Sequence, residues 1–306
     1  MKGISTPSFW NKKNSFFTFF LIPFSWIYYL ITLGNKFTGI FSSSLKIKII
    51  CVGNLYIGGT GKTPLVKKIY EHINKEKKCC ILKKYRKGHI DEINLLKETS
   101  KIITPKIRLK GLLNAQDNGY SVAVLDDGMQ DYSFKKDISI LCIKSKTGFG
   151  NELILPSGPL REPLKEIEQY KIAVINGIKN EKINDTLKKY NPDIKIFYSH
   201  YEIKNIEEFY NKKFLAFCGI GDNESFFEIL KKNNIKVLDT VEFEDHHTFT
   251  EKEILKLLDK ANNENLKLIT TDKNFNSIPE KYKKTIYKTS IELIIDNNSD
   301  LLNEIN

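Results

Sequence analysis

The sequence predicts an α/β protein built around a parallel sheet, and two observations support this prediction. Short apolar runs of strand type alternate with segments of helical spacing, as they do in successive β-α-β units. The chain has 306 residues, which is enough for two domains of about 150 residues each. Hydrophobic residues make up 41% of the chain and charged residues 28%, so a wholly disordered protein is excluded.

The first element is an uncharged segment at residues 16–33, FFTFFLIPFSWIYYLITL, with lysines on both sides. It is marginal for a membrane span, which needs about 20 apolar residues, and Pro23 would interrupt the hydrogen bonds of a spanning helix. Phenylalanine, tryptophan and tyrosine dominate it, and these residues favour the boundary between membrane and water. We therefore expect a membrane-associating helix that lies in the interface or inserts shallowly. A true span, a buried core helix and a signal peptide are the alternatives.

The other elements follow in order along the chain. An apolar run at 47–52 predicts a buried strand, helical spacing begins at Pro64, and further strands are expected at 78–82, 121–125, 138–143 and 172–175. A second unit should begin between 199 and 212, with strands at 214–219, 236–240 and 266–271 and helices at 224–232 and 252–261. These expectations divide the chain into an N-terminal membrane-associating segment (1–45), a main domain (46–208) and a second, smaller α/β domain (209–306).

Charge and cysteine content limit the classes of protein further. Lysine and arginine outnumber the acids by 11, which fits a generally solvated surface, an anionic membrane, a phosphorylated substrate or nucleic acid. Charge alone does not choose among these. The five cysteines are an odd number in a long chain and contain no C-x-x-C pair, which excludes a disulfide scaffold and argues against a structural zinc site.

A glycine-rich loop at 53–66 carries the clearest chemistry. Between the strand and the helix the chain reads Gly-Gly-Thr-Gly-Lys-Thr, a variant of the phosphate-binding P-loop in which Tyr56 replaces the first glycine. Glycines let backbone N–H groups surround an anion, Lys62 can reach the β- and γ-phosphates, and the Thr63 hydroxyl can hold Mg²⁺. A simple glycine-rich turn is the alternative. The candidate nucleotide-binding residues are Tyr56, Ile57, Gly58, Gly59, Thr60, Gly61, Lys62 and Thr63.

Two acids at the end of a later strand complete the expected site. The run at 122–125 is apolar and ends in Asp126 and Asp127. A parallel strand would deliver these carboxylates to the edge of the sheet beside the phosphate loop, where they can hold Mg²⁺. A pair of acids capping the turn before Gly128 is the alternative. We thus expect a P-loop NTPase-like sheet domain with Thr63, Asp126 and Asp127 as candidate metal ligands.

Several separated motifs then make the chain resemble the tetraacyldisaccharide 4′-kinases of lipid A biosynthesis. The motifs, in chain order, are PSFW at 7–10, GNLYIGGTGKTPLV at 53–66, Asp91-Glu92 followed by Leu95-Leu96, LDDGMQ at 125–130, GNELILPSGPLREPL at 150–164, AFCGIGDNESFF at 216–227, FEDHHTFT at 243–250 and ITTDK at 269–273. They extend over nearly the whole chain, and the GPLREP and FxDHHxF patterns are specific to this family among P-loop proteins.

The resemblance implies transfer of the γ-phosphate of ATP, with Mg²⁺, to the 4′-hydroxyl of a tetraacyldisaccharide 1-phosphate, giving lipid IVA. It implies that Asp91 is the catalytic acid and that a histidine of the Asp-His-His motif, taken as His246, is its partner. It also implies that Gln130, Arg161 and Glu162 line the active cleft. Without the resemblance, Asp91 would be read as a solvated helix start and the histidine pair as a surface turn.

The resemblance also implies the surroundings of the protein. The partners would be the lipid disaccharide and the anionic surface of the inner membrane, at its cytoplasmic face, with no nucleic acid and no obligatory protein partner. The alternatives are a P-loop kinase of another substrate and a membrane-bound P-loop ATPase switch. Three stretches depart from the family pattern: 82–89 replaces the usual Ser-Arg-Gly-Tyr-Gly run, Asp131 stands where histidine is usual, and 270–274 reads TTDKN.

Overall fold

The computed structural model describes residues 7–12, 15–37, 39, 42–86, 93, 96–97, 99–244 and 247–306. The described chain divides into two compact units. The larger unit contains the residues up to 200 together with 295–306, and the smaller unit contains 201–294. The chain therefore passes between the units twice, and the two are described separately below.

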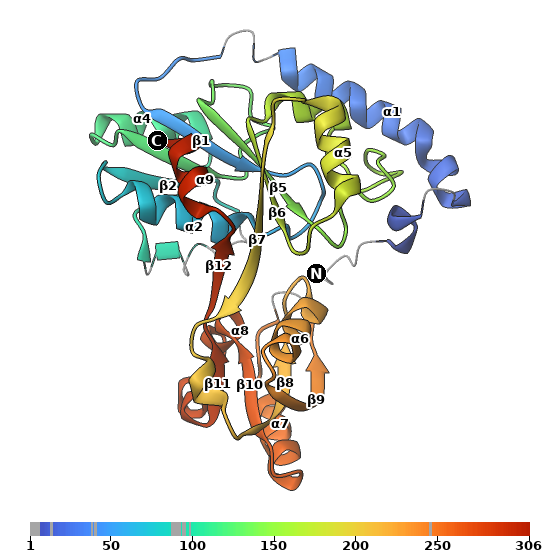
Figure 1. The fold of residues 1–306 in the computed structure, drawn as a ribbon, viewed down its shortest axis with the longest axis vertical. Coiled ribbons are helices and arrows are strands. Elements are labelled where there is room, and N and C mark those ends of the chain that lie inside the picture. The colour runs from blue at the N-terminus through green and yellow to red at the C-terminus, as the bar shows by residue number, and fades with distance from the viewer. Residues whose placement is uncertain are drawn as a thin grey trace. The chain divides into compact units, whose positions relative to one another are not determined.

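The larger unit contains most of an eight-stranded sheet in the order β12-β7-β6-β5-β1-β4-β2-β3 (Figure 1). Its edge strand β12 and the end of β7 consist mainly of residues assigned to the smaller unit. All the pairs from β7 to β3 are parallel, which confirms the predicted sheet type. The strands are β1 (Lys48–Gly53), β2 (Cys79–Lys83), β3 (Ile102–Ile103), β4 (Val122–Asp126), β5 (Ile138–Lys144), β6 (Ile172–Asn176), β7 (Lys195–Ile203) and β12 (Ile291–Ile295). The central strands are buried on both faces, so their sequences are continuous apolar runs rather than alternating ones.

Strand order places a ligand crevice beside β1. The chain leaves β1 to form β2 and β3 on one side, returns with β4 next to β1, and then crosses to β5 on the other side. Connections from the carboxyl ends of β1 and β5 thus leave in opposite directions, and such a switch point opens a crevice where ligands bind. The glycine-rich loop lies in the connection that follows β1.

Helices cover both faces of this sheet. One face carries α4 (Arg108–Asp117) and α5 (Glu181–Tyr190), whose Leu112 and Leu187 join the same apolar cluster as Ile49 of β1. On the opposite face lie α2 (Lys62–Ile73) and α9 (Asn298–Ile305). Lys48 is the neighbour of Ile49 in β1, so its side chain points to the other face of the sheet. There it donates to the Ile305 carbonyl of α9 at 3.0 Å.

The predicted N-terminal helix is present as α1 (Phe16–Phe37) and lies along the outside of the larger unit (Figure 1). It is the one described helix that is long and apolar enough to cross a membrane. Its inward face is small and polar: Ser25 donates to the Ile154 carbonyl at 3.0 Å and contacts the Ser157 hydroxyl at 2.8 Å. Its outward face is apolar and exposed. That face consists of Phe16, Phe17, Phe19, Phe20, Phe24, Trp26, Ile27, Leu30, Ile31 and Phe37.

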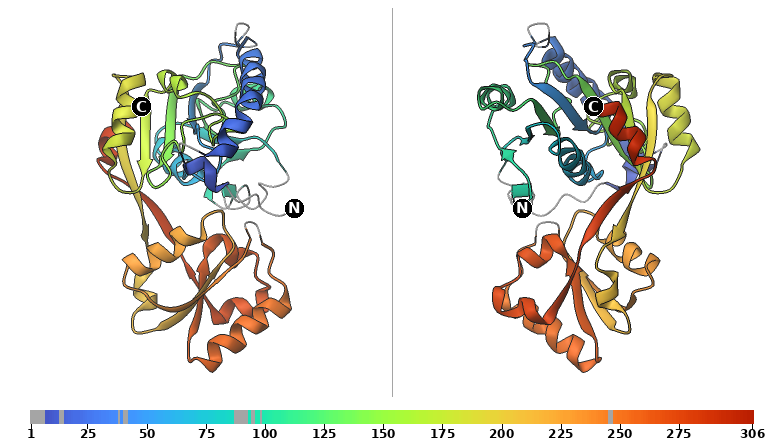
Figure 2. Two further views of the ribbon diagram at one scale, coloured as in Figure 1. Left: turned by 90° about the vertical axis from the view of Figure 1, so that its right-hand side faces the viewer. Right: turned by 60° about the vertical axis from the view of Figure 1, so that its left-hand side comes forward.

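The smaller unit has a parallel four-stranded sheet in the order β11-β10-β8-β9. Alternate residues of β8 feed two apolar clusters, one with α7 and one with α6, so helices pack on both faces (Figure 2). Its elements are β8 (Lys213–Cys218), α6 (Asn223–Lys232), β9 (Lys236–Glu242), α7 (Glu251–Asn263), β10 (Lys267–Thr271), α8 (Asp272–Asn276) and β11 (Ile286–Thr289).

The unit boundaries differ from the predicted division at 208/209. The smaller unit begins at Tyr201, and the last residues return to the larger unit instead of completing a continuous C-terminal domain. They return because α9 buries Leu301 and Ile305 against the larger unit. Four strands, β3, β7, β11 and β12, were not predicted from the sequence. They lie at or near sheet edges and lack continuous apolar runs, and all but β7 are short.

Candidate active site

The glycine-rich loop has the conformation that an anion-binding loop requires. It connects β1 to α2, and Gly61 forms the helix N-cap with φ of 89°. Gly58 has φ of 124°, so both positions favour glycine for conformational reasons. A Cβ placed on Gly59 would meet no atom within 4 Å, so packing does not explain that glycine. Open space in front of free N–H groups at a helix N-terminus is suited to phosphate.

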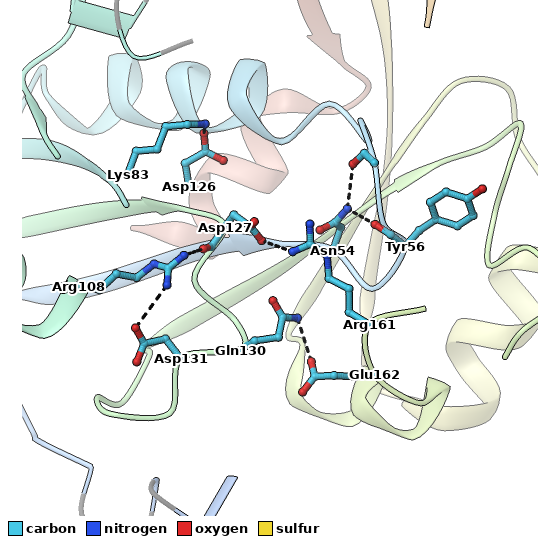
Figure 3. Close-up of polar contacts among 11 residues, drawn as sticks. Asn54, Tyr56, Lys83, Arg108, Asp126, Asp127, Gln130, Asp131, Arg161 and Glu162 are labelled. Atoms are coloured by element: carbon cyan, nitrogen blue, oxygen red, sulfur yellow. Dashed lines mark hydrogen bonds and ion pairs between the residues drawn. The ribbon is translucent and has the colours of Figure 1, made fainter. Parts of the chain in front are cut away.

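The loop is held from behind by the GPLREP segment. Ile57 donates its N–H to the Pro159 carbonyl at 2.9 Å, and Arg161 donates its N–H to the Leu55 carbonyl at 2.8 Å. Inside the loop, the buried side-chain amide of Asn54 donates to the backbone carbonyls of Tyr56 and Gly58 (Figure 3). These contacts fix the loop before any ligand arrives. Asn54 was not among the predicted site residues, because a polar residue after a strand gives no distinctive signal.

The remaining loop residues are placed as follows. Tyr56 is buried and pairs with Leu160 across an antiparallel bridge. Thr60 is also buried, and its carbonyl accepts a hydrogen bond from the Cys142 thiol at 3.0 Å. Lys62 and Thr63 are the first two residues of α2, so their side chains stand at the mouth of the loop.

Thr63 and Asp126 meet as predicted for a metal site. The Thr63 hydroxyl donates to Asp126 Oδ2 at 2.8 Å. Lys83, the last residue of β2, also pairs with Asp126 Oδ2, and its Nζ lies 3.4 Å from Thr63 Oγ1. The other carboxylate oxygen, Asp126 Oδ1, is buried and has no hydrogen-bond partner among the described residues. An unpaired buried carboxylate oxygen next to a threonine hydroxyl fits Mg²⁺, which prefers oxygen ligands and keeps several waters or phosphate oxygens.

Asp127 faces a different set of groups. Arg161 donates to Asp127 Oδ1 at 2.7 Å, and Arg108 contacts the Asp127 backbone carbonyl (Figure 3). Burial alone would raise the pKa of Asp127, but Arg161, Lys62 and Arg108 together hold that pKa below its usual value. The carboxylate therefore stays ionised and engaged with arginine. The structure brings Asp126, rather than Asp127, next to Thr63.

Lys62 lies among these charges. Burial lowers the pKa of Lys62 and Arg161 lowers it further, while Asp127 and Asp126 act in the opposite direction. No hydrogen bond or ion pair to Lys62 is formed by the described residues. A lysine at a loop mouth with no protein partner is available to a phosphate oxygen.

The predicted cleft residues Gln130 and Glu162 contact one another. Gln130 Nε2 donates to Glu162 Oε2 at 2.9 Å, and the Tyr132 hydroxyl donates to Glu162 Oε1 at 2.6 Å. Glu162 is buried and in turn raises the pKa of Tyr132, after the larger effect of burial. From α1, Tyr28 lies close enough for both Arg161 and Glu162 to influence its pKa. Gln130, Tyr132 and Glu162 are thus held in one hydrogen-bonded group.

The two predicted catalytic residues, Asp91 and His246, lie outside the described residues. The neighbouring His247 is described, and its ring packs against Phe243 and Phe249 with centroids 4.7 and 5.0 Å away. Its Nε2 lies 3.1 Å from Glu253 Oε2 at the start of α7. These contacts hold the His247 ring between two aromatic side chains and Glu253, all within the smaller unit.

The chain is similar to one family of known proteins over nearly its whole length. A family model described as LpxK, tetraacyldisaccharide-1-P 4′-kinase, matches residues 17–306. The tetraacyldisaccharide 4′-kinase of Pelagibacter ubique (strain HTCC1062) is 38% identical over 99% of this chain and 97% of its own length. That of Bradyrhizobium diazoefficiens is 30% identical over 88% of this chain and 85% of its own length.

A solved structure agrees as well. The crystal structure of the "apo" form of LpxK from Aquifex aeolicus in complex with ATP has a TM-score of 0.71 and 25% identity, and the match covers 94% of this chain and 98% of that one. The P-loop fold, the family model and the curated relatives lead to one conclusion: this chain belongs to the tetraacyldisaccharide 4′-kinase family, the kinases of lipid A biosynthesis.

Proposed function

We propose that this kinase binds ATP in the crevice beyond β1 and β4 and transfers its γ-phosphate to the 4′-hydroxyl of a tetraacyldisaccharide 1-phosphate. The observation that carries this proposal is the contact between Thr63 and Asp126 at the mouth of a glycine loop with open space in front of it. The Aquifex aeolicus relative, solved in complex with ATP, supports the nucleotide. A hydroxyl and a carboxylate meeting beside such a loop are the protein's share of a Mg²⁺–nucleotide site.

In this proposal each side chain has one task. Thr63 and Asp126 would hold Mg²⁺, which would supply positive charge beside the transferring phosphate. Lys62 contacts the transferring phosphate. Asp127 keeps Arg161 oriented at the loop, so that the guanidinium can face negative charge that develops during transfer.

The proton of the sugar hydroxyl needs an acceptor. We assign this task to Asp91 with His246 as its partner, on the family resemblance alone. A histidine beside a carboxylate can orient it and stabilise the charge it carries, and such assistance typically contributes about 10²–10⁴ in rate.

The outward face of α1 supports a place at a membrane. Its large side chains are exposed, whereas its inward face bonds to the loop at 154–157 through Ser25. A helix with its polar side on the protein and its apolar side on solvent suits the membrane interface, where a tetraacylated substrate would also reside. The net charge of +11 suits anionic lipid, and we place the protein at the cytoplasmic face of the inner membrane.

ATP turnover with and without the acylated disaccharide tests the proposal. A kinase must seat the hydroxyl before transfer, so ADP should form only when purified chain, Mg²⁺, ATP and tetraacyldisaccharide 1-phosphate are all present. ADP formation at the same rate without the lipid would instead identify an ATPase switch. No turnover with the acylated disaccharide, but turnover with another alcohol, would identify a kinase of another substrate.

A further inference from the structure

Lys83 is an unusual residue in its position. It is the one lysine that is buried among the residues the structure describes, with a relative exposure of 4%. It ends β2 at the carboxyl edge of the sheet, and the parallel register sets it directly opposite Asp126 of β4. Residues opposite one another in a sheet place their side chains on the same face, so the two charges meet as a consequence of strand register. Lys83 also lies in the stretch at 82–89, where this chain departs from the usual family run.

The ammonium of Lys83 lies on the two oxygen groups assigned above to the metal. It forms a buried ion pair with Asp126 Oδ2 and lies 3.4 Å from Thr63 Oγ1. An ammonium has three donors and no acceptor, and a buried charge is stable only when it is paired. Asp126 Oδ1 on the other side of the same carboxylate is left without a partner among the described residues. One oxygen of the Asp126 carboxylate is therefore paired with the Lys83 ammonium, and the other has no partner among the described residues.

We propose that Lys83 is a resident cation of the metal site, which keeps Asp126 and Thr63 assembled in the metal-free protein and competes with Mg²⁺ for them. This inference rests on the proposed function, because it concerns the same two metal ligands. Without Lys83, a buried carboxylate would have to be neutralised or hydrated whenever the metal is absent. With Lys83 present, the site keeps its shape between turnovers.

This arrangement should weaken the binding of Mg²⁺. Mg²⁺ would approach the open Asp126 Oδ1, whereas Lys83 Nζ, at 3.4 Å from Thr63 Oγ1, takes one of the two acceptor positions of that hydroxyl. The two cations also repel one another across a few ångströms in a poorly hydrated site, where screening is weak. Lys83 should therefore weaken Mg²⁺ binding while stabilising the metal-free fold, and replacing it should reverse both effects.

The test compares Lys83→Met with the full-length parent and with Lys84→Met. Methionine keeps the length of the side chain and removes the charge, and Lys84 is the adjacent, partly exposed lysine outside the site. Two quantities are measured: the Tm of the metal-free protein, and the Kd of Mg²⁺ from calorimetric titration of protein saturated with a non-hydrolysable ATP analogue. Neither readout depends on catalytic activity.

For Lys83→Met we expect the metal-free Tm to fall by several degrees and the Kd of Mg²⁺ to fall by about tenfold or more. Lys84→Met should match the parent in both. An unchanged Tm would overturn the inference, and so would an unchanged or weaker Mg²⁺ affinity. If Lys83→Met is recovered only when Mg²⁺ is present, that dependence supports the inference, because the metal then replaces the missing cation.

If Lys83→Met fails to fold under all conditions, Lys83→Gln is measured by the same two criteria, because its amide can still donate to Asp126. The parent separates this inference from the proposed function. A parent that binds neither the analogue nor Mg²⁺ contradicts the proposed function. A parent that binds both, with a Mg²⁺ affinity insensitive to Lys83, contradicts only the role of Lys83.

Discussion

The outward face of α1 can be altered without touching the rest of the protein, so replacing Phe20 and Phe24 by serine is an informative perturbation. Their relative exposures are 66% and 52%. A phenylalanine side chain presents about 200 Å², so roughly 120 Å² of each ring is available to a membrane. At about 25 cal/mol per Å², complete transfer of that area from water contributes about 3 kcal/mol per ring, and half-depth insertion about 1.5 kcal/mol.

Even the shallow case corresponds to about tenfold in membrane affinity per ring, so the double variant should bind roughly a hundredfold more weakly. Flotation with liposomes that contain anionic lipid measures this affinity. The Tm and the binding of an ATP analogue should stay at the parent values, because neither ring is buried in the protein.

Ser25→Val is the matched control on the inward face of the same helix. It removes the hydrogen bonds to the Ile154 carbonyl and to Ser157 and leaves buried polar groups without a partner, which should destabilise the fold by about 1–3 kcal/mol. Its membrane affinity should not fall, since the outward face is intact. Equal flotation of the Phe20/Phe24 double variant and the parent would refute this role of the outward face. A large drop in the Tm of that double variant would show that the face packs against protein.

Three further predictions concern the site. Lys62→Ala should lower turnover by about 10²–10³ and leave the Tm unchanged, because it removes one cation from the transferring phosphate; activity within about threefold of the parent would contradict the loop assignment. Asp91→Asn and His246→Ala should each lower kcat by about 10²–10⁴ with little change in ATP affinity, and the double variant should be little worse than either, whereas additive losses would contradict a dyad. Arg161→Met should raise the pKa of Asp127, which Arg161 helps to hold below its usual value. The stability that the ionised carboxylate contributes above about pH 4 should then be lost at a higher pH when the Tm is measured during acid titration. If the Tm falls over the same pH range as in the parent, Arg161 does not set that pKa.

Much of the larger unit was predictable because its signals are local. The runs that became β1, β4 and β5 are continuous and apolar, as strands buried on both faces must be, and the loop glycines stand between a strand and a helix. Parallel strands share an edge for their carboxyl ends, so the meeting of Thr63 with the acid pair followed from chain order. Which acid would meet Thr63 did not follow, since Asp127 has φ of 63° and its carboxylate turns to Arg161.

Features that depend on distant pairing could not be predicted. Lys83 reads as an ordinary surface lysine until the register of β2 with β4 places it opposite Asp126. The return of α9 to the larger unit depends on the burial of Leu301 and Ile305. That burial could not be predicted from the sequence of a short helix of mixed composition. The inward face of α1 was equally hidden, because Ser25 looks like an interruption of an apolar run and is instead the residue that bonds to the loop at 154–157.

Mass spectrometry of the lipid product tests the central claim most directly. Tetraacyldisaccharide 1-phosphate is analysed before and after incubation with the purified chain, Mg²⁺ and ATP, and fragmentation locates any added group. We expect the gain of one phosphoryl group at the 4′ position of the disaccharide, in step with ADP formation, and a gain slower by about 10²–10³ with Lys62→Ala. Formation of ADP with an unchanged lipid, or a phosphoryl group at another position, would contradict the central claim.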